Sequence, residues 1–415
     1  MVECFHKYII TFIYFLCLIV IAGVSIIIIF TTKDEKKNRT KRTSFTQKEI
    51  NNLTVIKKDD DLVKPYCKLN AEFELVEIGN GMNGLLISDP SSLTSHIQIH
   101  MKYGAFIDTT PGISHFGEHM IFQGSENYEP IYPIVDELSG MKGSIINAYT
   151  GGYYQAYFIT LNYNFQFEKA LDLITDAFRY PLYLPSIIEK EIEVINNEFY
   201  YNFHSYITEF DIIRQLASNK TSFHGTTDGN NETLKVNESE LLSKKLKGYH
   251  MAFKNPKNLF FVMQSNNTLN ESEEYAKKYM NYKMHEFSDN EIDKEDKKQL
   301  EENVKKIESI EIFDSNIYKH GIYFNSFIPN NTLHIYFHLG NTDFKGLKFD
   351  ILEYYSYLFN SKYLLDILRD KHYIEVDKKI TINRLDTYNY IKNNDFIYLE
   401  LNLTENGLKE INDII

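Results

Sequence analysis

Three kinds of hydrophobic pattern follow one another along the chain. An uninterrupted apolar run without charged residues occupies Tyr8 to Phe30, a polar and charged stretch follows, and from Glu72 onward short apolar segments alternate with turns. Long uncharged runs are typical of membrane-spanning helices, whereas polar stretches that lack large apolar groups cannot bury a core. We therefore expect an N-terminal transmembrane helix over residues 1–30, a polar stalk over residues 31–65 and a folded body beyond them.

The first apolar run is interpreted as a signal anchor in a single-pass membrane protein. A cleaved signal peptide is the alternative, because small residues between Ala22 and Ser25 resemble a cleavage site. The excess of basic residues after the run places the body in the cytosol, whereas N-x-S/T sequons at Asn52 and Asn266 suit a lumenal body. The side of the membrane is left open.

The body shows both strand and helix periodicities. Alternating apolar positions predict strands within residues 73–78, 84–88, 96–103, 144–149 and 153–161. Helical spacing predicts a helix that begins near Ser114, its expected N-cap, and further helices over residues 132–138, 165–178 and 187–205. This order of elements indicates an α+β fold, a mixed sheet with helices packed on one side.

A change in composition predicts a second domain. Residues 285–309 are almost entirely charged or amide-bearing, which is typical of an interdomain linker that is helical in part. Strands over 331–339 and 396–403, with a helix over 347–368, begin another α+β unit. We therefore expect a zinc-binding catalytic domain over 66–284, the linker, and an incomplete second domain over 310–415.

Charge and cysteine content exclude several classes of protein. The chain of 415 residues has a formal net charge of −13, which argues against nucleic-acid binding because phosphate contacts need a basic surface. Its three cysteines, Cys4, Cys17 and Cys67, are too few for a disulfide framework or a thiolate metal site.

His115, Glu118 and His119 form an H-x-x-E-H sequence within one predicted helix. Histidines at i and i+4 share a helix face, with the glutamate beside them. Two imidazoles can bind one zinc ion, and a carboxylate that does not bind it can take a proton from water. The alternative is two surface histidines beside a solvated glutamate. His334 and His338 have the same spacing but lie on a predicted strand, and we interpret them as ordinary strand residues.

A catalytic zinc takes three protein ligands and keeps one open position, so a third donor is needed. The acidic helix over residues 187–205 supplies candidates, because Glu191 and Glu198 are two turns apart and lie on one face. A solvated helix face is the alternative for both glutamates.

The sequence from Gly112 to Met120, followed by Phe122, Gly124 and Tyr128, resembles the signature of the pitrilysin and insulin-degrading (insulinase) family of zinc peptidases. The distance along the chain from His115 to Glu198 resembles that family as well. The resemblance extends from about Phe73 to the C-terminus.

Carried over by this resemblance, Glu198 is the third metal ligand and Glu191 is an outer carboxylate that orients a histidine. Asn147 and Ala148 resemble the family's edge strand, where an extended peptide pairs its backbone beside the metal. A plain hairpin is the alternative for this strand.

The resemblance implies a repeated insulinase-like domain, complete in its first copy and partial in its second. It implies a zinc metalloendopeptidase with one Zn²⁺ per chain, in which metal-activated water hydrolyses peptides or small unfolded proteins and Glu118 is the general base. Family members have four related domains in two halves, and nothing here matches the Arg and Tyr of the distal half. The alternative is therefore a catalytically incomplete subunit that binds peptide or a second chain supplying the C-terminal half.

Overall fold

The computed structural model describes residues 52–58, 62, 70–128, 134–141, 143–162, 164–205, 228–235, 238–306, 331–340, 354, 357–360, 362–375, 381–385 and 395–414. The predicted transmembrane helix, Tyr8–Phe30, lies outside these residues and stays a prediction. Within the described residues, no helix is both long and apolar enough to cross a membrane.

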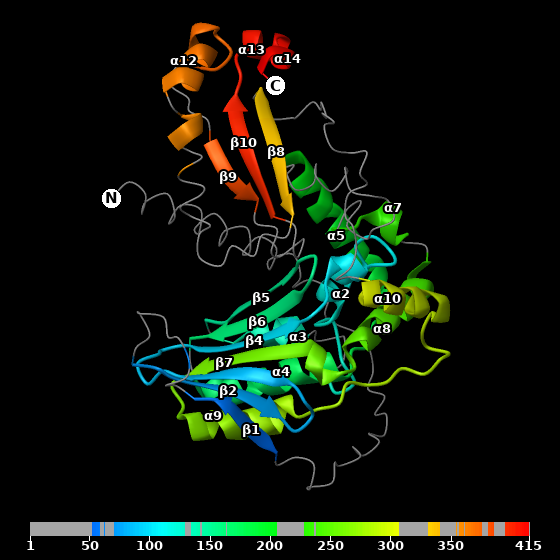
Figure 1. Ribbon diagram of the computed structural model, residues 1–415. Helices are drawn as coiled ribbons and strands as arrows, with labels where there is room; N and C mark the ends of the chain where they lie inside the picture. Colours follow the sequence, from blue (N-terminus) through cyan, green and yellow to red (C-terminus); the bar gives the residue numbers. More distant parts are fainter. Residues whose placement is uncertain are drawn as a thin grey trace. The chain divides into compact units, whose positions relative to one another are not determined.

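The larger sheet has seven strands in the order β1-β2-β3-β7-β4-β6-β5 (Figure 1). Strands β3 and β7 run parallel and all other neighbours run antiparallel, so the sheet is mixed, as predicted. Strand β5 forms one edge. The strands are β1 (Leu53–Lys57), β2 (Glu72–Ile78), β3 (Asn83–Ser88), β4 (Ser95–Met101), β5 (Ile145–Thr150), β6 (Gln155–Leu161) and β7 (Leu259–Ser265).

One face of this sheet holds most of the core. In β4, Ile97, Ile99 and Met101 are buried and alternate with half-buried polar residues, as the two-residue period of a strand requires. Helices α4 (Phe167–Arg179) and α9 (Leu269–Tyr275) lie along the packed face (Figure 1). The predicted layering of a sheet with helices on one side agrees with this arrangement.

Helix α2 (Ile113–Met120) lies beside the edge strand β5 and joins it to two further helices. It contacts α5 (Pro185–Ser205), α8 (Ser239–His250) and β5. The remaining helices of this part of the chain are η4 (Ala105–Ile107), α3 (Ile134–Ser139), η5 (Asn164–Gln166), α7 (Asn231–Leu234), η7 (Met251–Phe253), η8 (Pro256–Asn258), η9 (Ala276–Met280) and α10 (Lys294–Lys306).

A separate antiparallel sheet of three strands has the order β8-β10-β9. Its strands are β8 (Thr332–Gly340), β9 (Thr381–Leu385) and β10 (Asp395–Asn402), and its helices are α12 (Lys362–Asp370), α13 (Glu405–Lys409) and α14 (Ile411–Ile414). Leucines from β8, β10 and α12 form a small apolar cluster. The predicted strands are confirmed. Of the helix predicted over 347–368, the final turns belong to α12 and most of the rest lies outside the described residues.

Two segments predicted to lie outside the domains pack against the core; the stalk contains an unpredicted strand, whereas the helix in the linker agrees with the prediction that the linker is helical in part. Part of the predicted stalk is strand β1, in which Leu53 and Val55 pack against the core and which pairs with β2. The predicted linker contains α10, whose Leu300 is buried and which packs against α8. Both segments look polar because only one side of each faces the core. The domain boundaries themselves stay predictions.

The start of α2 is a correction. Ser114 is the second residue of the helix and not its N-cap, which is Gly112. Asp108 accepts hydrogen bonds from both the backbone N–H and the hydroxyl of Ser114, so a residue earlier in the chain supplies the capping carboxylate.

Candidate metal centre

Helix α2 presents the two histidines on the face opposite its buried residues. Ile113, Phe116 and Met120 are buried in the core, whereas the side chains of His115 and His119 remain partly exposed, at 14% and 20%. Their ring centroids are 4.9 Å apart and the ring planes are nearly perpendicular. The i, i+4 spacing therefore brings the two imidazoles together, as the sequence predicted.

A contact between two glycines places the loop that holds His115. The φ angles of Gly112 and Gly229 are 89° and 75°, and a Cβ on Gly112 would lie 2.3 Å from the Cα of Gly229. Only glycine allows this approach. It brings the backbone carbonyl of Asp228 within 2.8 Å of His115 Nδ1. A carbonyl can only accept, so Nδ1 is the donor, and in a neutral ring Nε2 then has the lone pair that could bind a metal.

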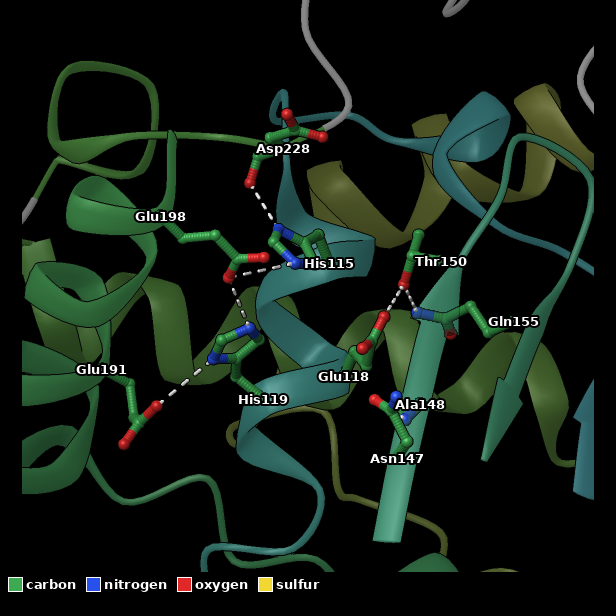
Figure 2. A network of polar contacts seen from close by, with 10 residues as sticks. All are labelled: His115, Glu118, His119, Asn147, Ala148, Thr150, Gln155, Glu191, Glu198 and Asp228. Atoms are coloured by element: carbon green, nitrogen blue, oxygen red, sulfur yellow. Dashed lines mark hydrogen bonds and ion pairs between the residues drawn. The ribbon is translucent and has the colours of Figure 1, made fainter. Parts of the chain in front are cut away.

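Helix α5 supplies the carboxylates from a distant part of the chain. Its buried residues Ile188, Ile192 and Ile195 recur at helical spacing. The neighbouring face turns Glu191 and Glu198 toward α2 (Figure 2). His119 Nδ1 lies 3.5 Å from Glu191 Oε2, and His119 Nε2 lies 3.4 Å from Glu198 Oε2. Each ring nitrogen of His119 thus faces its own carboxylate.

The donor atoms of His115, His119 and Glu198 fit the ligand set of a zinc ion. They lie within 4.8 Å of one another, with Glu198 Oε2 3.9 Å from His115 Nε2 and 3.4 Å from His119 Nε2. Tetrahedral zinc with bonds near 2.0–2.1 Å separates its ligand atoms by about 3.3 Å. Two nitrogens and one carboxylate oxygen are also the donors of many hydrolytic zinc sites. The 3.4 Å separation is close to this value and the 3.9 Å separation is longer, so the three donors could share one ion after small side-chain movements, with a fourth position left to water or substrate.

Charge around His119 favours a cation at this place. Burial alone would lower the pKa of His119, but hydrogen bonds to Glu191 and Glu198 outweigh burial and raise the pKa to about 9. The hydrogen bond with His119 lowers the pKa of Glu198. The carboxylates thus stabilise positive charge between themselves, and a proton on Nε2 occupies the position that a metal ion would take.

Glu191 is held by a further side chain. Gln123, just beyond α2, donates from Nε2 to Glu191 Oε1 at 3.0 Å. The amide fixes one oxygen of the carboxylate and the other oxygen faces His119. This is the arrangement by which outer carboxylates orient histidine ligands.

Glu118 lies beside the donor set and is not part of it. Burial raises the pKa of its carboxyl group, while His115 and a hydrogen bond from Thr150 oppose that change. Thr150 Oγ1 donates to Glu118 Oε2 at 2.5 Å. A buried carboxylate with a raised pKa can accept a proton from water and release it again.

A cavity of about 180 Å³ joins these groups to the edge strand. It is lined by His115, Glu118, Ala148, Tyr149, Thr150, Glu198 and Asp228. Ala148 lines this cavity, and its role in substrate binding stays a prediction. Asn147 is not among the residues that line the cavity, and its side-chain oxygen accepts a hydrogen bond from the backbone N–H of Ala148.

Sequence reasoning missed five residues of the site. Tyr149, Thr150 and Asp228 line the cavity, Gln123 holds Glu191, and Gln155 donates from Nε2 to Thr150 Oγ1. Gln123 is four residues beyond His119, so an extension of the helical spacing could have found it. Thr150 is part of the segment that resembles the family strand. The contact of Asp228 is made by its backbone, so residue type carries no signal for it.

The family model described as "Insulinase (Peptidase family M16)" matches residues 84–222, a range that contains the histidines and both glutamates. The resemblance to the insulinase and pitrilysin family is confirmed. The A-factor-processing enzyme of Saccharomyces cerevisiae is 32% identical over 177 residues, which are 42% of this chain and 17% of that protein. Human insulin-degrading enzyme is 33% identical over 129 residues, 31% of this chain and 12% of that protein.

Solved structures show the same fold. Pitrilysin superimposes with a TM-score of 0.68 and 22% identity, over 87% of this chain and 37% of that chain. A protease from Helicobacter pylori superimposes with a TM-score of 0.59 and 14% identity, over 82% of this chain and 78% of that chain. The chain therefore has an insulinase-like α/β fold, and its match spans less than a fifth of the two insulinase relatives named above.

Proposed function

We propose that this chain binds one zinc ion through His115, His119 and Glu198 and hydrolyses peptide bonds. The observation that carries the proposal is the gathering of two imidazole nitrogens and one carboxylate oxygen within 4.8 Å of one another, near enough to share one ion after small side-chain movements. The matching family model is described as a peptidase family, which supports the reaction type.

When bound, zinc would act as a Lewis acid toward water and the scissile carbonyl. His115 would be held by the Asp228 carbonyl and His119 by Glu191, so both rings keep their orientation. Glu118 would take the proton of the attacking water and pass it to the departing amine.

The edge strand β5 is the proposed substrate-binding surface. It forms one edge of the sheet, and Ile145 and Tyr149 are 59% and 38% exposed. An extended peptide could add to this edge through main-chain hydrogen bonds, with Asn147 and Ala148 beside the scissile bond. Because main-chain hydrogen bonds recognise extended backbone and depend little on the substrate's side chains, the proposed substrates are peptides and unfolded segments.

The variant Glu118→Gln tests the mechanism. It removes the base and keeps the shape of the side chain, so peptide hydrolysis should fall by about 10²–10⁴-fold while one zinc per chain remains bound. Hydrolysis is measured with an unstructured fluorogenic peptide and metal by atomic absorption. The control is Glu193→Gln, an exposed carboxylate on α5. Wild-type turnover by the Glu118→Gln protein would contradict the proposal.

A further inference from the structure

A chain of buried polar groups runs from the core to Glu118. Thr150 ends β5 and Gln155 begins β6, and the two residues are directly opposite each other in the strand pair. Gln155 is fully buried and donates from Nε2 to Thr150 Oγ1 at 2.9 Å. Thr150 in turn donates to Glu118 (Figure 2). The strand pairing therefore places a hydroxyl against the carboxylate of the proposed base.

The backbone carbonyl of Ser114 fixes the direction of the hydrogen bonds between Gln155, Thr150 and Glu118. Gln155 Nε2 lies 2.7 Å from the backbone oxygen of Ser114, which can only accept, so the amide nitrogen must face it. The buried hydroxyl of Tyr249 donates to Gln155 Oε1 at 3.1 Å, which agrees with that orientation. Gln155 is therefore a donor toward Thr150.

A hydroxyl has a single proton, and its direction follows from the groups around it. Because Gln155 donates to the oxygen of Thr150, the Thr150 proton is left to point at Glu118 Oε2. Donors to a carboxylate hold it in place, and hydrogen bonds to charged groups are stronger than those between neutral groups. One oxygen of Glu118 is thus held from the strand side.

We propose that Thr150 is a positioning residue for Glu118, and that Gln155 sets the direction in which the Thr150 hydroxyl donates. The proposal rests on the function proposed above for Glu118. Thr150 also belongs to the strand proposed to bind the peptide and lines the same cavity. The base is thereby held at a fixed distance from the backbone against which the substrate would lie.

A double-mutant cycle in zinc-free protein tests the contact without using activity. Thr150→Val should shift the unfolding equilibrium by about tenfold when Glu118 is present and by much less in a Glu118→Ala protein. Thr160→Val is the matched control: Thr160 lies at the other end of the same strand pair, is also half-buried, and its hydroxyl contacts His96. Equal effects of Thr150→Val in both backgrounds would overturn the proposal.

Steady-state hydrolysis tests the role in turnover. Thr150→Val should lower kcat by about 10–100-fold with KM and bound zinc unchanged, and Thr150→Ser should restore most of the rate because it keeps the hydroxyl. A rise in KM alone, or failure of Thr150→Ser to restore kcat, would overturn the role. A wild-type protein that hydrolyses no peptide would contradict the proposed function. The double-mutant cycle in zinc-free protein would still show whether Thr150 and Glu118 interact.

Discussion

Two pairs of histidines in this chain have the same i, i+4 spacing and lie in different secondary structure. His115 and His119 on helix α2 have ring centroids 4.9 Å apart. His334 and His338 lie on strand β8, where a rise of about 3.3 Å per residue separates such positions by about 13 Å. His334 instead stacks with Tyr336 on the same strand. The same spacing therefore brings two imidazoles together on a helix and places the two positions far apart on a strand.

The largest expected effect separates the two pairs. His119→Ala removes a donor that faces two carboxylates and should abolish stoichiometric zinc binding, because three protein ligands are the usual minimum of a catalytic site. His334→Ala should leave one zinc per chain. Zinc is measured by atomic absorption after gel filtration. Equal zinc loss in both variants would break the comparison between helix and strand.

A smaller effect is expected for the carboxylate behind His119. Glu191→Gln keeps the shape of the side chain but removes the charge that faces His119 Nδ1, so zinc affinity should fall by about 10–100-fold. The measurement is competition with a chromogenic chelator, and Glu193→Gln is the control on the same helix. Affinity unchanged within twofold would show that Glu191 does not orient the ligand.

His250, which lies outside the site, has a lowered pKa, in contrast to the raised pKa of His119. His250 is fully buried beside Tyr183 and Phe287, and burial, then the nearby His285, lowers its pKa to about 3. The folded state thus favours neutral His250, so its contribution to stability is complete above pH 6.5 and is lost as the pH falls from 6.5 toward 3.

Replacement of this residue should reduce the acid sensitivity of folding. Between pH 6 and 4, the unfolding free energy of the His250→Phe protein should fall less steeply with decreasing pH, by about 1.4 kcal/mol per pH unit. This difference corresponds to the one proton that His250 takes up on unfolding. Denaturant titrations at a series of pH values measure the slope. An unchanged slope would mean that His250 takes up no extra proton on unfolding.

The sequence was sufficient to predict much of the local structure and the three candidate metal donors. Period-two alternation located β2, β3 and β4, and helical spacing located α4 and α5. The i, i+4 histidines and the family resemblance pointed to Glu198. The strands, the helices and the histidine pair depend on residues that are close together in the chain, and Glu198 was found through the family motif.

What the sequence did not predict depends on contacts between distant segments. Strand β7 joins β3 and β4 from far along the chain, and parallel pairing needs a long connection that leaves no local signal. The Asp228 carbonyl reaches His115 only through the contact between Gly112 and Gly229. Backbone contacts of this kind are independent of side-chain type, so a single sequence does not show them.

The most direct test of the account is a crystal structure of zinc-loaded protein with data collected on both sides of the zinc absorption edge. We expect one anomalous peak about 2.0–2.2 Å from His115 Nε2, His119 Nε2 and a Glu198 oxygen, with Glu118 outside bonding distance. A peak away from these three side chains, or no peak in protein that has been incubated with zinc, would contradict the central claim.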